Sequence, residues 1–184
     1  MKTKVKLFAI IIALILMSSC VSLTSSFIPA DKLYLQARQF VKEGRQDFAF
    51  LNLNELLRTY PQYRFAAEAK FALAEYSFLQ RDYNKALSEL VSFLNNYPQH
   101  KAAVFAKVFL YVIVTDKAWL TSEEATRVAQ TIKEEFFANP AFFVFSEFKE
   151  KRFTSLLGNF YVLKEYVDKI DIFANGKPLL SVSP

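Results

Sequence analysis

The stretch that decides the fold runs from Phe65 to Gln99, FAAEAKFALAEYSFLQRDYNKALSELVSFLNNYPQ. It contains two segments in which apolar residues recur every three or four positions, the spacing that gives an α-helix one apolar face. The break at Arg81-Asp82 separates them, which indicates an antiparallel pair of helices joined by a short loop. Neither apolar face can be buried by its own helix, so the pair must pack against further elements.

Identical residues recur 37 positions apart around this stretch, as Ala37 and Ala74 do. The matched pairs are Ala37 with Ala74, Ala49 with Ala86, Leu53 with Leu90, Leu57 with Leu94, Pro61 with Pro98, Ala66 with Ala103, Ala69 with Ala106 and Leu73 with Leu110. Small alanines allow the two helices of a pair to approach closely, and the proline ends the second helix. We therefore expect helix pairs that stack into a solenoid with a continuous core.

Several positions of this unit have the spacing of the tetratricopeptide repeat: Ala74, Tyr83, Ala86, Leu90 and Pro98. The longer period, with Tyr-Pro as terminator and Pro-Gln-His after it, resembles the variant in BamD-type outer-membrane assembly lipoproteins. The resemblance covers Asp31 to about Asp116, with fewer repeats than such proteins have. We predict an all-α fold, a tetratricopeptide-like solenoid of helical hairpins, with two clear repeats and a degenerate third in residues 31–140.

The N-terminal segment, residues 1–19, has the pattern of a lipoprotein signal peptide. Lysines precede an apolar run from Leu7 to Met17 that is shorter than the ~20 residues of a membrane span. The ending up to Ser19 and Cys20 resembles the bacterial lipobox. The resemblance implies cleavage between these two residues, lipid attachment at Cys20, and a lipidated tether over residues 20–30; the alternative is an ordinary secretory signal with a stray thiol.

The residue after Cys20 bears on the localisation of the protein, and the composition bears on its possible ligands. Val21 follows the cysteine, and the absence of an aspartate there favours the periplasmic face of the outer membrane. The full chain has 23 basic and 18 acidic side chains, and three of the lysines belong to the signal segment, so no basic face for nucleic acid is expected. Only three glycines, none in a glycine-rich loop, argue against phosphate-binding turns. We expect no cofactor other than the covalent lipid on Cys20.

The third unit contains a helix, residues 102–115, that is apolar on nearly all sides and must be covered on both faces. The C-terminal third is the expected cover. Thr121 and Glu124 form a capping box for one covering helix that extends to Asn139-Pro140.

The repeat pattern stops at Phe142, and residues 141–184 are interpreted as a cap that seals the open end of the solenoid. A helix is predicted from residues with helical spacing: Phe160, Leu163, Val167 and Ile170. Alternation around Asn175-Gly176 predicts a short β-hairpin. The alternative for this aromatic region is an exposed docking patch.

Residues that could support catalysis are scarce. His100 is the only histidine, which leaves almost no material for a metal site or a histidine-activated nucleophile, so we expect a surface or capping role for it. Carboxylate pairs such as Glu123-Glu124 diverge on their helices. No enzymatic activity, metal site or small-molecule substrate is predicted.

The candidate partner-binding groove lies on the first helix of the best repeat, where charged and aromatic side chains form a second face: Glu68, Phe71, Glu75 and Phe78. Such a face suits an extended peptide or a partner helix. The alternative is that the phenylalanines belong to the core and the glutamates are merely solvated.

We interpret the chain as a lipid-anchored interaction module at the outer membrane, and its resemblance implies the β-barrel assembly machinery as partner. Three alternatives stay open. These are a repeat lipoprotein of another envelope assembly, in secretin or pilus biogenesis or in cell-wall-linked division; a subunit of an envelope enzyme with a pocket in the aromatic C-terminal region; and a structural spacer.

Overall fold

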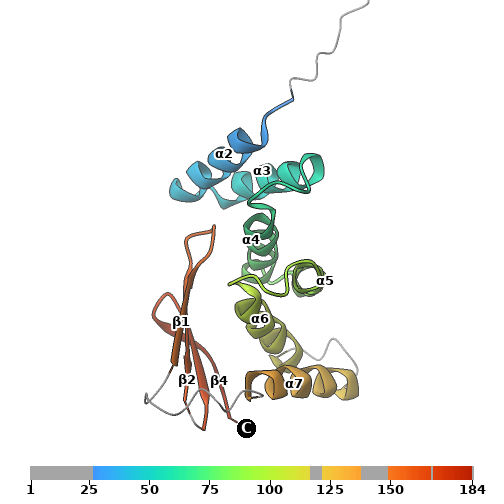
Figure 1. Ribbon diagram of the computed structural model, residues 1–184, viewed down its shortest axis with the longest axis vertical. Coiled ribbons are helices and arrows are strands. Elements are labelled where there is room, and N and C mark those ends of the chain that lie inside the picture. Colours follow the sequence, from blue (N-terminus) through green and yellow to red (C-terminus); the bar gives the residue numbers. More distant parts are fainter. Residues whose placement is uncertain (1–26, 117–121, 138–148, 167, 184) are drawn as a thin grey trace, which may run out of the picture.

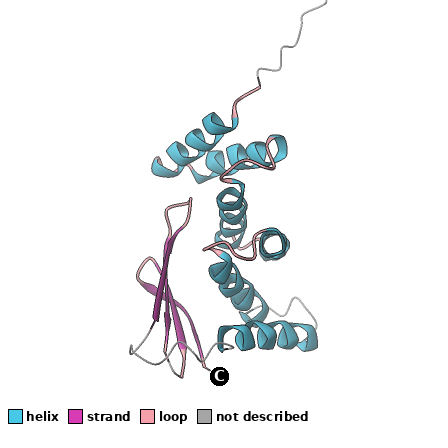
Figure 2. Ribbon diagram, in the orientation of Figure 1, coloured by secondary structure: helices cyan, strands magenta, loops and turns pink. Residues whose placement is uncertain are grey.

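The structure, a computed structural model, describes residues 27–116, 122–137, 149–166 and 168–183. The predicted signal peptide, Cys20 and most of the tether lie outside these ranges, as do Thr121 of the capping box and residues 142–148 of the aromatic C-terminal region. The described helices are α2 (Ala30–Lys42), α3 (Gln46–Thr59), α4 (Ala66–Leu79), α5 (Tyr83–Asn96), α6 (Ala103–Asp116) and α7 (Ser122–Phe137). The described strands are β1 (Lys149–Thr154), β2 (Phe160–Glu165), β3 (Ile170–Ala174) and β4 (Lys177–Val182). Figure 1 and Figure 2 show the helices following one another as a solenoid, with the strands along one side.

The helices form three successive hairpins, α2 with α3, α4 with α5, and α6 with α7, which confirms the predicted solenoid. The repeated alanines stand at the helix contacts: Ala37, Ala49, Ala74 and Ala86 are completely buried. The second hairpin turns where the sequence predicts, because Arg81 adopts a left-handed φ of 61° and the Asp82 side chain accepts a hydrogen bond from the Lys85 N–H at 3.3 Å. This bond satisfies one of the free N–H groups at the start of α5.

The Tyr-Pro terminators have the same backbone geometry in both repeats. The Tyr60 N–H donates to the Leu56 carbonyl at 2.7 Å, and 37 positions later the Tyr97 N–H donates to the Phe93 carbonyl at 2.8 Å. The proline that follows each tyrosine cannot extend the helix, since it has no N–H and its ring restricts the residue before it. The sequence repeat is therefore a structural repeat down to its hydrogen bonds.

The C-terminal cap is an antiparallel sheet in the order β1-β2-β3-β4, so the helix predicted from Phe160 to Ile170 is wrong. Tyr161 and Leu163 are buried while Phe160 is 40% exposed, which is the two-residue alternation of a strand. The predicted hairpin is confirmed between β3 and β4, where Asn175 and Gly176 both adopt positive φ angles, 52° and 77°.

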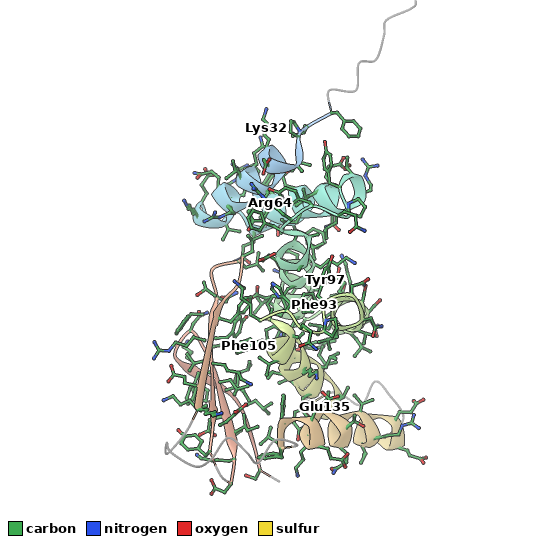
Figure 3. The ribbon with its side chains drawn as sticks, viewed as in Figure 1. Lys32, Arg64, Phe93, Tyr97, Phe105 and Glu135 are labelled. Atoms are coloured by element: carbon green, nitrogen blue, oxygen red, sulfur yellow. The ribbon has the colours of Figure 1, made fainter. Side chains whose placement is uncertain are left out.

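The sheet packs on the inner face of the solenoid, which we define as the face formed by α2, α4 and α6. Its inward side chains meet an aromatic cluster: Phe71, Phe105, Phe109, Phe153 and Tyr161, with ring centroids 5.2 to 6.5 Å apart along the contacts that connect them. Figure 3 shows Phe105 of α6 on the side that faces the strands. The apolar helix α6 is thus covered by α5, α7 and the sheet, as its composition requires.

Candidate functional site

The four residues of the predicted groove lie on α4, and the structure separates them into two kinds. Phe71 and Glu75 are completely buried, because the sheet of the same chain covers the inner face at this level. Glu68 and Phe78 remain partly exposed. The prediction of an open groove is therefore wrong at Phe71 and Glu75: Phe71 belongs to the core, and Glu75 is not solvated.

Glu75 is the most unusual residue of this face, because it is a buried carboxyl group without a basic partner among the described residues. Its Oε1 accepts hydrogen bonds from the Tyr161 hydroxyl and from Asn159 Nδ2, the latter at 2.9 Å. Its Oε2 has no hydrogen-bond partner among the described residues. Burial raises the pKa of Glu75 to about 7, although hydrogen bonds from Tyr161, Ser155 and Asn159 oppose this rise by favouring the ionised form.

Sequence reasoning missed the partners of Glu75. Asn159 and Tyr161 lie 84 and 86 positions further along the chain. Tyr161 is in β2 and Asn159 directly precedes this strand, in a region where the apolar spacing predicted a helix. The signal that could have indicated this strand is its composition, since aromatic Phe160 and Tyr161 and β-branched Val162 are residue types that favour strands.

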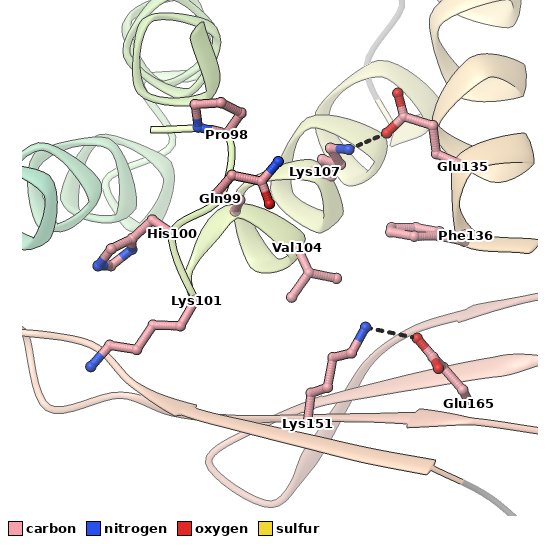
Figure 4. A pocket seen from close by; sticks show the side chains of 11 residues that line it. Pro98, Gln99, His100, Lys101, Val104, Lys107, Glu135, Phe136, Lys151 and Glu165 are labelled. Carbon is pink, nitrogen blue, oxygen red and sulfur yellow. Dashed lines mark hydrogen bonds and ion pairs between the residues drawn. The ribbon is translucent and has the colours of Figure 1, made fainter. Parts of the chain in front are cut away.

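The open part of the inner face is a cavity of about 360 Å³ between the α5–α6 loop, α6, α7 and the sheet (Figure 4). The residues that line it are Pro98, Gln99, His100, Lys101, Ala103, Val104, Lys107, Glu135, Phe136, Lys151 and Glu165. His100, for which the sequence predicts a surface or capping role, is among them. Its Nδ1 accepts the Ala102 N–H at 3.2 Å, which confirms a capping role at the start of α6. The Nε2 of His100 lies 3.6 Å from Oε1 of Glu68, so this partly exposed groove residue stands beside the cavity.

Charges in this cavity are paired across its rim. Lys107 contacts Glu135 of α7, and Lys151 Nζ lies 3.2 Å from Glu165 Oε1 on the neighbouring strand. Val104 contributes an apolar side chain between them. Because each of the two carboxylates has its own lysine, the arrangement does not resemble an acid-base pair, and it suits contact with a protein segment of mixed character.

The described ranges contain neither a metal-ligating cluster nor a helix that could span a membrane. No group of three or more metal-ligating side chains gathers within them. None of the helices they contain has the length and apolar character needed to cross a bilayer.

The fold and site define a class, a tetratricopeptide-like helical solenoid whose inner face is largely closed by its own C-terminal sheet. The sequence model of the YfiO family, described as outer membrane lipoprotein, matches residues 28–153, more than half of the chain. The chain belongs to this family, and the protein is a lipid-anchored protein of the outer membrane. No curated protein matches the chain. The family match includes the solenoid and most of β1, and it ends before β2, β3 and β4.

Proposed function

We propose that this lipoprotein is a non-enzymatic scaffold for the assembly of β-barrel proteins, held at the periplasmic face of the outer membrane by a lipid on Cys20. The observation that carries the proposal is the match of the outer-membrane lipoprotein family across the whole solenoid. A solenoid presents an extended surface on a rigid array of helices, which suits the binding of other proteins. The anchor then keeps this surface beside the membrane into which barrels insert.

The cavity beside His100 is the part of the inner face that we propose as a partner contact. It combines an apolar side chain, Val104, with exposed polar groups such as Gln99 and with lysine–glutamate pairs. Protein interfaces commonly surround an apolar centre with a polar rim. Charged groups of a partner segment could replace one member of each lysine–glutamate pair, so that no charge is left unpaired when the interface is buried.

The test is a crosslinking pull-down from envelopes that contain the full-length lipoprotein, with Cys20→Ala as the localisation control. We expect recovery of barrel-assembly proteins that depends on Cys20. A photo-crosslinking residue at Gln99, in the cavity, should capture them, whereas the same residue at Val91, which is 45% exposed on α5, should not. Recovery of secretin, pilus or cell-wall proteins would move the function to another envelope assembly, and recovery of no protein would favour a spacer.

A further inference from the structure

The turn between β1 and β2, residues 155–159, connects the sheet to the first repeat. Leu157 at its tip is 5% exposed and belongs to the apolar cluster formed by α2, α3 and α4. At the next position, a Cβ atom on Gly158 would lie 4.0 Å from Val41 Cγ1 of α2, and this glycine has a left-handed φ of 84°. The backbone of the turn thus lies directly against the inner face of the solenoid.

The turn has its own internal hydrogen bonds. The Ser155 N–H donates to the Asn159 carbonyl at 2.9 Å, the Gly158 N–H donates to the Ser155 carbonyl at 3.1 Å, and the Asn159 N–H donates to Ser155 Oγ at 3.2 Å. Because these bonds are confined to the turn, water can compete for them once the turn leaves the solenoid. What it loses on leaving is the burial of Leu157 and its contacts with α4.

The contact with α4 is a chain of polar groups that ends at Glu75. Asn159 Nδ2 donates to Glu75, and Asn159 Oδ1 accepts from Asn175 Nδ2 at 2.9 Å. Asn175 Oδ1 in turn accepts the Phe160 N–H at 2.8 Å. Both turns at this end of the sheet are therefore connected to one buried carboxyl group on the solenoid.

We propose that residues 155–159 are an autoinhibitory latch, which covers the inner face of the first two repeats while Glu75 is protonated and opens when Glu75 ionises. The proposal rests on the proposed function in one respect, namely that a partner uses the inner face, here its part over α2 and α4 in addition to the cavity beside His100.

The physical reason for opening is that an ionised Glu75 has no compensating charge. The side chains that shift its pKa are three hydrogen-bond donors without a charge, Tyr161, Ser155 and Asn159. Tyr161 is the titratable one of the three. Burial also raises the pKa of Tyr161, so this partner stays neutral. Burying a carboxylate that only neutral donors stabilise is unfavourable in free energy. Opening of the latch hydrates the carboxylate and removes this cost.

The pH dependence follows from the two environments of the carboxyl group. In the closed latch its pKa is about 7, and opening, which hydrates the carboxyl group, lowers this pKa toward the ordinary value of 4.5. The ratio of open to closed latch then rises by at most about tenfold per pH unit between these values, and by at most about 70-fold in all from pH 5 to pH 8. Acid closes the latch, and neutral to alkaline pH opens it.

Hydrogen exchange of the full-length lipoprotein in detergent micelles tests this inference without any partner. After correction for intrinsic exchange rates, we expect amide protection in residues 155–159 to fall from pH 5 to pH 8, by up to about 70-fold. Glu75→Gln should remove most of that pH dependence, while Glu123→Gln, an exposed substitution on α7, should keep it. Equal pH dependence in Glu75→Gln and the wild type, or loss of protection in the whole solenoid at once, would overturn the latch.

A second measurement covers the case in which Glu75→Gln does not fold. The ¹³C carboxyl resonance of Glu75 in the wild-type protein should titrate over the same pH range in which the turn loses protection. A carboxyl titration with no accompanying change in exchange overturns the latch and leaves the proposed function intact. Conversely, a failed pull-down counts against the proposed function alone, because exchange of the turn needs no partner.

Discussion

Glu75 should make the stability of the whole protein depend on pH, because unfolding also transfers its carboxyl group to water. Its pKa is about 7 in the folded chain and 4.5 as an ordinary exposed group. Below pH 4.5 the group is protonated in both states and has no effect on stability. As pH rises from 4.5 to 7 the carboxyl group ionises in the unfolded state but stays protonated in the folded state, so the folded state becomes less stable, and the loss is complete above pH 7. The difference between the two pKa values corresponds to about 3 kcal/mol at pH 8.

The assay is urea unfolding at pH 5, 6, 7 and 8, followed by far-UV circular dichroism, for the wild type and Glu75→Gln. Other titrating groups are the same in both proteins, so their contributions cancel in the difference. We expect the variant to gain about 2.5 kcal/mol relative to the wild type between pH 5 and pH 8, and less if the latch already opens in the folded state. Parallel stability curves would refute the reasoning, since they would show that Glu75 has the same proton affinity in the folded and unfolded chain.

Four further predictions concern packing, capping, backbone and anchor. Phe71→Ala should cost about 3 to 5 kcal/mol in urea unfolding, because the ring is completely buried against three other aromatic rings, whereas Phe160→Ala, at a side chain 40% exposed, should cost less than about 2 kcal/mol. Asp82→Ala should lower the unfolding free energy by about 1 kcal/mol through loss of the α5 cap, and a larger effect of Asp82→Asn would contradict this. Gly176→Ala should lower the melting temperature, because its φ of 77° strains a residue with a Cβ by roughly 1 kcal/mol. Cys20→Ala should abolish incorporation of radiolabelled palmitate and move the protein out of the membrane fraction; retention of label would refute attachment at this residue.

The solenoid could be predicted because every signal for it is local or periodic. Apolar spacing defines each helix, and Pro61 and Pro98 mark where two of them end. The buried alanines, such as Ala49 and Ala86, recur at the repeat distance because helix contacts recur there. A stacked repeat contacts mainly its neighbours, so short stretches of sequence contain most of the information.

The C-terminal region was harder to predict because two periods coexist in it. Phe160, Leu163 and Ile170 fit a helix, while Tyr161 and Leu163 fit a strand, and short apolar segments do not distinguish the two. The hairpin at Asn175-Gly176 was predictable, since its positive φ angles need those residue types. The rest of the sheet became evident only from its pairing, which sequence periodicity does not contain.

The sequence by itself determined the helical repeats, their boundaries and the tight turns, because these depend on neighbours along the chain. Only the tertiary structure determined which residues of the inner face are buried. Glu75 and Phe71 have the helical spacing of an open groove, yet a sheet formed more than 70 positions further along the chain covers both of them. Burial depends on which surfaces meet in space, and that contact converts a solvated glutamate into a buried carboxyl group whose pKa is about 7.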